Sequence, residues 1–251
     1  MYIANFAPDM EPLRTYHILK THINKPNDKD RLNEIIKQID ISNVPPYTQN
    51  EFYKLVEAYS DVFCLPDEAV ATNNFYTQNI NLTDNAPVFI SNYKTIHTQG
   101  DEIQKQVNKM LRDNIIEPSV SSYNSPILLV LKKADSNKSK QWRLVVDFRM
   151  LNKRVLADKF PLPRIDAILD QLGRAKFFSV LDLQAGFHQI SLDENYRKYT
   201  AFSTQSGHYQ FTRLNISPNS FQRMMTIAMA GLTPDMAFVY VDDIIVVGCS
   251  V

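Results

Sequence analysis

The chain has 251 residues, 44% of them hydrophobic, with 27 basic and 27 acidic side chains. This length suits one large domain or two small ones, and a net charge of zero neither requires nor excludes a nucleic-acid partner. The two cysteines, Cys64 and Cys249, are too far apart in sequence for a disulfide framework or a zinc motif, so we expect reduced thiols.

The N-terminal part of the chain is polar and acidic. The first eighty residues contain seven basic and eleven acidic side chains, a net charge of minus four. Residues 1–8 lack the basic start and apolar core of a signal peptide, and no apolar run is long enough to cross a membrane. We expect a short helix over 31–41. A second helix is predicted to begin at the capping-box sequence Thr48-Gln-Asn-Glu51, with an apolar face of Phe52, Leu55, Val56 and Tyr59.

The middle of the chain is basic. Residues 67–91 look extended and irregular, and a helix is predicted over 101–113. Two strands are predicted at 127–131 and 142–146, joined by a flexible loop. Between Leu131 and Phe160 there are nine basic residues and three Asp, a local net charge of plus six. Such a stretch favours contacts with a nucleic-acid backbone that do not depend on base sequence and weaken with salt.

The C-terminal part alternates short strands and helices. Helices are predicted at 164–172, with Gly173 in the C′ position, and at 218–230. The expected strands are 177–182, 187–192, 199–203 and 208–212, followed by two apolar runs at the end of the chain. Strands that pair locally with helices between them are typical of an α+β fold.

Two adjacent carboxylates, Asp242 and Asp243, separate the last two apolar runs. Buried charge in such a place is costly unless it is paired or binds a metal, although Asp is also common in hairpin turns, and this motif alone fits both interpretations. A third carboxylate, Asp182, ends the predicted strand 177–182. If that strand lies beside the hairpin, the three carboxylates converge and could hold two divalent cations about 4 Å apart. Taken alone, Asp182 is explained at least as well as a turn residue.

Six sequence blocks follow one another in an order that resembles a known family. The chain is similar to the reverse transcriptases of gypsy-type LTR retrotransposons, which are related to retroviral polymerases, from about residue 62 to residue 251. The blocks that carry the resemblance are Trp142-Arg-Leu-Val-Val-Asp-Phe-Arg-Met-Leu-Asn-Lys153, Phe160-Pro-Leu-Pro-Arg-Ile165, Phe178-Ser-Val-Leu-Asp-Leu-Gln-Ala-Gly-Phe-His-Gln-Ile190, Lys198-Tyr-Thr-Ala-Phe202, Ser217-Pro-Asn-Ser-Phe-Gln-Arg223 and Tyr240-Val-Asp-Asp243.

The resemblance implies an α+β right-hand polymerase, with fingers and an incomplete palm over residues 61–251. Residues 1–60 would be a partly helical spacer of unknown role. The implied activity is RNA-directed DNA synthesis by two-metal nucleotidyl transfer from a dNTP to a primer 3′-hydroxyl. The implied partners are dNTPs and an RNA or DNA template with its primer, with no membrane and an oligomeric state left open. The implied location is the cytoplasm, in a retroelement particle, or the nucleus.

The resemblance also assigns roles to individual residues. Asp182 and Asp242 would bind two Mg²⁺ ions directly, or Mn²⁺ in their place, with Asp243 in support. Residues assigned to the incoming dNTP are Arg143, Lys132, Lys133 and Phe187. Phe187 would exclude a 2′-hydroxyl, although a core aromatic is the alternative, and a lysine in this loop could equally be solvated. The remaining assignments, to primer and template, are Tyr240, Val241, Gln222, Arg223 and Trp142, the last with a core role as its alternative.

The chain departs from the family pattern in two places. A Pro-Phe-Gly-Leu-like segment is missing between Leu214 and Pro218, where Asn-Ile-Ser follows directly. Sequence corresponding to the thumb and ribonuclease H is also absent after Val251, so we expect a fragment of a longer polyprotein. The alternative is a degenerate, non-catalytic chain that serves at most as a weak nucleic-acid-binding or interaction module.

Overall fold

The computed structural model describes residues 2–3, 29–42, 44–66, 68–73, 75–93, 97–131, 142–173, 175–215, 217–232 and 236–248. The basic loop with Lys132 and Lys133, as well as Cys249, lies outside these ranges. The Cys64 thiol is half-buried and lies within hydrogen-bond distance of the Leu65 and Glu68 carbonyls. Within the described ranges, no helix is both long and apolar enough to cross a membrane.

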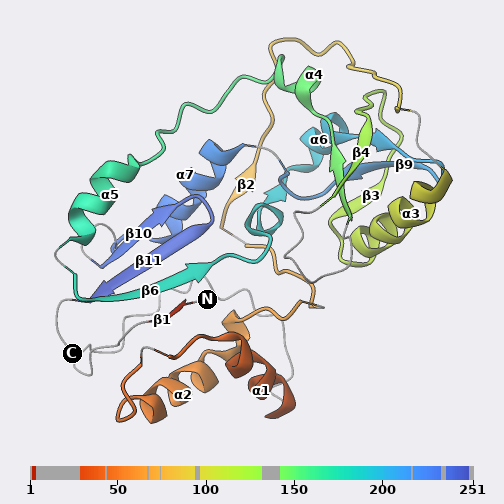
Figure 1. Ribbon diagram of the computed structural model, residues 1–251. Coiled ribbons are helices and arrows are strands. Elements are labelled where there is room, and N and C mark those ends of the chain that lie inside the picture. The colour runs from red at the N-terminus through yellow and green to blue at the C-terminus, as the bar shows by residue number, and fades with distance from the viewer. Residues whose placement is uncertain are drawn as a thin grey trace. The chain divides into compact units, whose positions relative to one another are not determined.

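The chain divides into two compact units (Figure 1). Unit 1 consists of residues 1–76, 158–189 and 217–251, and unit 2 consists of residues 77–157 and 190–216. Each unit is therefore assembled from segments that are far apart in sequence. The division separates Asp182, Asp242 and Asp243, in unit 1, from Arg143, in unit 2.

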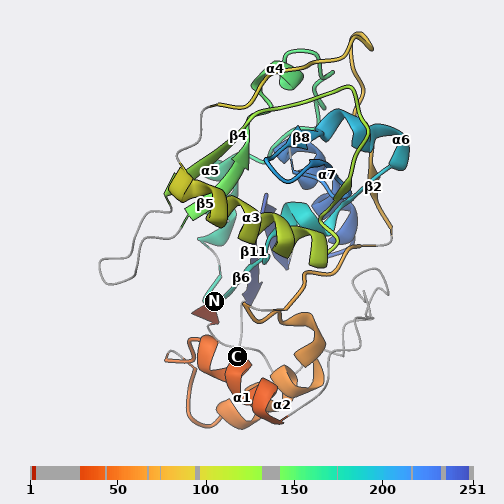
Figure 2. The same cartoon turned by 90° about the vertical axis from the view of Figure 1, so that its right-hand side faces the viewer.

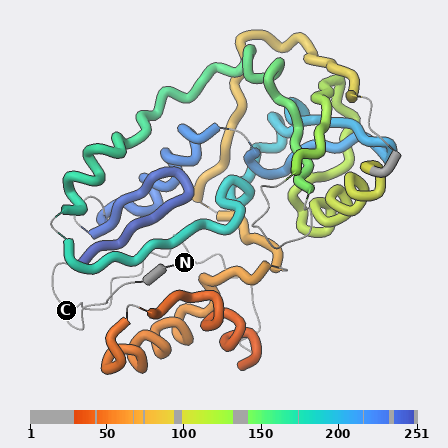
Figure 3. Tube along the Cα trace, in the orientation of Figure 1, coloured from red at the N-terminus to blue at the C-terminus, as the bar shows by residue number. Residues whose placement is uncertain are grey.

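The central element of unit 1 is a four-stranded sheet in the order β1-β6-β11-β10. Its three longer strands are antiparallel neighbours (Figure 3), and α7 packs against β10. Buried apolar side chains of these strands and of α7 form the core between them. The elements of unit 1 are β1 (Tyr2–Ile3), α1 (Lys29–Gln38), α2 (Gln49–Ala58), η2 (Ser60–Val62), α5 (Ile165–Leu172), β6 (Phe177–Asp182), η3 (Gly186–Gln189), α7 (Pro218–Ala228), β10 (Ala237–Tyr240) and β11 (Asp243–Gly248).

Unit 2 contains three small sheets, β3-β9-β8, β4-β5 and β2-β7. Helix α3 packs on β3 and β5 (Figure 2). The elements of unit 2 are β2 (Thr77–Gln78), α3 (His97–Arg112), β3 (Ile116–Pro118), β4 (Ile127–Leu131), β5 (Trp142–Val146), α4 (Arg149–Asn152), β7 (Ser191–Leu192), α6 (Glu194–Arg197), η4 (Lys198–Thr200), β8 (Phe202–Ser203) and β9 (His208–Phe211).

Most of the predicted elements are confirmed, and β4, β5 and β6 have the predicted bounds. The predicted strand over 187–192 is confirmed only at Ser191–Leu192, as β7, and is wrong before that, because residues 186–189 form a 3-10 turn. Ala185 has a left-handed φ of 47°, and the N–H of His188 donates to its carbonyl at 2.8 Å. The predicted capping box at Thr48 is also wrong. Its hydroxyl donates to the carbonyl of Pro45 at 2.9 Å and makes no cap to α2.

Candidate active site in unit 1

Asp182 and Asp243 are brought together by strand register. Asp182 is the last residue of β6 and Asp243 is the first residue of β11, and the two are Cα partners in the antiparallel ladder. Directly opposed residues of an antiparallel pair project from the same face of the sheet. Both side chains are exposed, so the sheet places two carboxylates at one accessible end.

Asp242 lies in the tight turn between β10 and β11. Its backbone carbonyl accepts a hydrogen bond from the N–H of Leu183 at 3.2 Å, which ties the turn to the end of β6. Its Oδ1 atom is buried and has no hydrogen-bond partner. Burial raises the pKa of Asp242, and the negative charges of Asp182 and Asp243 raise it further. The negative charges of Asp182 and Asp243 thus act on Asp242, while the expected convergence of all three carboxylates on one metal site stays a prediction.

This carboxylate chemistry suits a hard divalent cation. An unpartnered buried carboxylate oxygen beside two like charges is an arrangement that a cation would stabilise, and Mg²⁺ takes few protein carboxylates and completes its shell with other oxygens. In the part of the chain that the structure describes, however, no three acidic, histidine or cysteine side chains are close enough together to form a metal site by themselves. The residues fit a cation, but a complete three-carboxylate cage is not formed.

Gly186 separates this carboxylate from the aromatic core. A Cβ atom on Gly186 would lie 2.7 Å from the Oδ1 atom of Asp242 and 2.7 Å from the ring of Phe221. The rings of Phe187 and Phe221 pack at an interplanar angle of 40°, with centroids 4.9 Å apart. Phe187 directly follows Gly186, the glycine beside the Asp242 carboxylate. The ring of Phe187 packs on Phe221, a core aromatic. Its predicted role in excluding a 2′-hydroxyl stays a prediction.

The predicted template residues of α7 are both engaged inside unit 1. Gln222 is buried and hydrogen-bonds to the backbone of the Asp242 turn, while its predicted place near a template strand stays a prediction. The guanidinium of Arg223 is paired with Asp158 at 2.6 Å and lies over the ring of Phe160. This pairing lowers the pKa of Asp158. The contacts tie the segment that precedes α5 to the first turns of α7.

Tyr240 and Val241 flank the carboxylates. Tyr240 ends β10 as the Cα partner of Asp243, and Val241 has a left-handed φ of 52°. Their proximity to a primer terminus stays a prediction, because nothing in the structure stands for a primer.

A partly polar hollow in unit 2

Arg143 and Trp142 lie on β5, and their side chains differ in exposure. Arg143 is exposed and Trp142 is half-buried. The side chain of Gln106 on α3 bridges this strand: its amide donates to the carbonyl of Trp142 at 3.0 Å and accepts from the N–H of Leu144 at 2.8 Å. The strand that presents Arg143 is therefore fixed by the helix, although contact with a dNTP stays a prediction.

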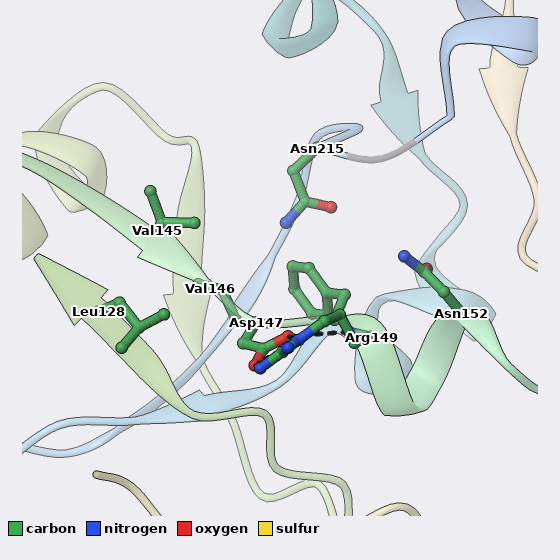
Figure 4. A pocket seen from close by; sticks show the side chains of 8 residues that line it. Leu128, Val145, Val146, Asp147, Arg149, Asn152 and Asn215 are labelled. Atoms are coloured by element: carbon green, nitrogen blue, oxygen red, sulfur yellow. Dashed lines mark hydrogen bonds and ion pairs between the residues drawn. The ribbon is translucent and has the colours of Figure 1, made fainter. Parts of the chain in front are cut away.

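A hollow of about 470 Å³ opens beside the end of β5 (Figure 4). Its polar side is built on Asp147, which accepts hydrogen bonds from the Arg149 guanidinium at 2.7 and 2.9 Å and from the Tyr93 hydroxyl at 3.1 Å. These bonds, chiefly those from Arg149, hold the pKa of Asp147 well below its usual range. The residues that line the hollow are Leu128, Val145, Val146, Asp147, Phe148, Arg149, Asn152 and Asn215.

The hollow beside β5 was not predicted from the sequence. Asp147, Arg149 and Asn152 belong to the quoted block that begins at Trp142, but no role was assigned to them. The signal was present in the sequence, since Asp-Phe-Arg places a carboxylate two residues before a guanidinium. Asn215 could not have been found this way, because it is far from the block in sequence. Its Oδ1 atom is buried without a hydrogen-bond partner, and its side chain is directed toward the hollow (Figure 4).

Comparison with known proteins

Unit 1 carries an antiparallel sheet with two opposed carboxylates at one end, and β5 of unit 2 presents an exposed arginine, features that fit part of a nucleic-acid polymerase. Residues 130–250 match the family model described as "Reverse transcriptase (RNA-dependent DNA polymerase)". The chain belongs to the reverse transcriptases of gypsy-type retrotransposons.

Two similar curated proteins are from Drosophila melanogaster. The chain is 51% identical over 245 residues to the retrovirus-related Pol polyprotein from transposon 412, covering 96% of the chain and 19% of that protein. It is 38% identical over 208 residues to the Pol polyprotein from transposon gypsy, covering 81% of the chain and 20% of the relative. The chain thus spans about a fifth of the length of these relatives.

Solved structures confirm the predicted fold class. A foamy viral protease-reverse transcriptase in complex with an RNA/DNA hybrid is similar with a TM-score of 0.75 and 25% identity, covering 88% of this chain and 29% of the other. The same enzyme in complex with dsDNA gives a TM-score of 0.73 at 25% identity, covering 87% of this chain and 45% of the other. The α+β architecture is that of a partial reverse transcriptase.

Proposed function

We propose that this chain contributes the nucleotidyl-transfer site of an RNA-directed DNA polymerase, acting on an RNA or DNA template with a primer and on dNTPs. One observation carries the proposal. The ladder places Asp182 opposite Asp243, and next to them lies the buried, unpartnered Oδ1 atom of Asp242. A site that concentrates negative charge at an accessible sheet end is suited to divalent cations and to a polyphosphate that arrives with them.

The residues of unit 1 would have different roles in the reaction. Asp182 and Asp242 would hold Mg²⁺, with Mn²⁺ as a substitute. Asp243, directly opposite Asp182 in the ladder, would add a supporting negative charge. The bound cations would activate the primer 3′-hydroxyl and neutralise charge on the phosphates. Gly186 leaves room for the Asp242 carboxylate. The ring of Phe187, held by Phe221, would meet the sugar of the incoming nucleotide and disfavour a 2′-hydroxyl.

The residues of unit 2 would contact phosphate and base. The planar guanidinium of Arg143 suits the triphosphate, and Lys132 and Lys133 would add charge from the adjoining loop. The hollow beside β5 suits a nucleobase, because it has apolar walls, amide groups at Asn152 and Asn215, and an exposed guanidinium at Arg149. Nucleic-acid complexes of the foamy viral relative support this class of partner.

A second candidate is a non-catalytic chain that only binds nucleic acid. Ser217, next to the missing Pro-Phe-Gly-Leu-like segment, has a left-handed φ of 95°, which is consistent with a shortened, strained connection. In addition, no complete metal cluster is found among the described residues.

Primer extension distinguishes the two candidates. The substrate is poly(rA)/oligo(dT) with Mg²⁺ or Mn²⁺, and the control is the double variant Asp242→Asn, Asp243→Asn. Polymerase function predicts extension that is lost in the control. No extension by the folded wild-type chain, together with retained binding of the primer-template, would favour the non-catalytic candidate.

A further inference from the structure

The side chain of Gln222 connects helix α7 to the turn that carries Asp242. Its Nε2 atom donates to the carbonyl oxygen of Val239 at 3.2 Å, and its Oε1 atom accepts from the N–H of Val241 at 2.8 Å. The residue is 2% exposed. A buried amide with donor and acceptor both satisfied is costly to disturb, because any loss leaves a polar group unpaired.

The turn that Gln222 contacts has an unfavourable backbone. Val241 has a φ of 52°, a region in which a β-branched residue is rare. Such a conformation persists only where surrounding contacts impose it. The hydrogen bond to Gln222 is made by the N–H of Val241 itself, so it acts at the strained residue.

The conformation of Val241 determines where the next residue points. Asp242 follows directly, and its Oδ1 atom lies in the space beside Gly186 and the Phe221 ring. Phe221 and Gln222 are consecutive on α7. Phe221 therefore lies beside the space that the Asp242 carboxylate occupies, and Gln222 hydrogen-bonds to the turn that carries Asp242.

We propose that Gln222 is a positioning residue that fixes the left-handed turn at Val241 and thereby the direction of the Asp242 carboxylate. The use of that carboxylate for metal binding rests on the proposed function, whereas its direction does not. The chemical consequence is that metal affinity depends on a side chain that would not itself touch the metal.

Two variants and one matched control test the proposal. Gln222→Met keeps the length of the side chain and removes both hydrogen bonds, while Gln222→Glu keeps an acceptor for Val241. The control is Thr226→Val on the same helix, because it removes one side-chain hydrogen bond, to the carbonyl of Gln222 at 2.9 Å, without touching the hairpin. Mn²⁺ binding without nucleic acid is measured by the electron paramagnetic resonance signal of free Mn²⁺, and urea unfolding is measured in parallel.

We expect Gln222→Met to raise the Mn²⁺ dissociation constant about tenfold, or ~1.4 kcal/mol. Gln222→Glu should have a smaller effect, and Thr226→Val should leave the constant unchanged. Unchanged Mn²⁺ affinity in folded Gln222→Met protein would overturn the proposal.

A double-mutant cycle with Val241→Gly provides a readout that does not depend on metal. Glycine adopts a positive φ without strain, so it should stabilise the wild-type background, in which Gln222 holds Val241 at that φ, more than the Gln222→Met background, in which the turn can relax without glycine. Equal effects in both backgrounds would overturn the proposal. If the wild-type chain binds no Mn²⁺, the proposed function fails, and this cycle still decides whether Gln222 holds the turn.

Discussion

Asp182 and Asp243 are Cα partners at the end of the β6–β11 ladder, so two carboxylates face each other across neighbouring strands. Like charges at directly opposed positions destabilise a sheet. An arrangement that costs stability and lies at an accessible sheet end is typical of a functional site. The cost itself can be measured.

Asp243→Asn should stabilise the metal-free protein, because it removes the repulsion between the opposed charges. We expect a gain of about 0.2–1 kcal/mol in the free energy of unfolding, measured with urea at neutral pH. Asp166→Asn on α5 is the control, since that side chain is 83% exposed and lies 3.8 Å from the Arg164 guanidinium, a cation, so its substitution relieves no like-charge repulsion there. Equal changes in the two variants would contradict the arrangement.

Asp242→Asn should change the response of the protein to divalent cations. The raised pKa of Asp242 means that its ionised form is disfavoured in the folded state, so the amide should be more stable than wild type without metal. Added Mn²⁺ should raise the melting temperature of the wild-type protein by mass action and leave that of Asp242→Asn unchanged. Equal shifts would place the cation elsewhere.

The ion pair of Asp158 and Arg223 should make stability depend on acid pH. The folded-state pKa of Asp158 is lowered, so the pair stabilises the protein above the unfolded-state pKa of about 3.9 and loses this contribution as pH falls through the lower, folded-state value. Asp158→Asn should therefore be less stable than wild type at neutral pH, with a difference that shrinks on acidification. Urea unfolding from pH 7 to pH 3 measures this difference, and a pH-independent difference would contradict the role of charge.

Arg149 should contribute to nucleic-acid binding through charge. Its side chain is 79% exposed beside the hollow. Arg149→Ala should weaken binding of an RNA/DNA hybrid. It should also reduce the magnitude of the slope of log K against log salt concentration by about one. Arg112→Ala is the control in the same unit, since Arg112 is similarly exposed and paired with Asp113. Fluorescence anisotropy at several salt concentrations measures both variants, and equal salt slopes would exclude Arg149 from the interface.

The hairpin and the strands that carry the carboxylates could be predicted because their signals are local. The apolar runs on both sides of Asp242 and Asp243 required two strands, and the run ending at Asp182 required a third. The register that pairs Asp182 with Asp243 could only be stated as a condition, because strand order is a tertiary property.

Phe187 shows the limit of local patterns. Its alternating neighbours favour a strand, but the tilted packing of its ring on Phe221 and the turn at Ala185 override them. The burial of Gln222 could not be predicted, because a helix sequence alone does not say which face is buried.

Substitutions at Ser217 should show whether the missing segment leaves strain in the backbone at the start of α7. Ser217 caps α7 by accepting a hydrogen bond from the N–H of Ser220 at 3.3 Å, while its own φ of 95° is costly for a non-glycine residue. Ser217→Gly should relieve this strain at little loss of capping and stabilise the protein by about 1 kcal/mol, whereas Ser217→Ala should lose the cap, keep the strain and destabilise it by a similar amount. Destabilisation by both substitutions would show that the left-handed backbone stores no strain.

Inserting Pro-Phe-Gly-Leu after Leu214 tests the same connection from the other side. If the short connection holds Ser217 in its strained conformation, the insertion should remove the advantage of Ser217→Gly, because the backbone then relaxes without glycine. It should also raise primer extension relative to the uninserted chain, since positioning errors near a reacting centre are costly in rate. A Gly-Ser-Gly-Ser insertion of equal length is the control for chain length alone. Equal extension with both insertions would show that length, and not the side chains of the segment, limits the site.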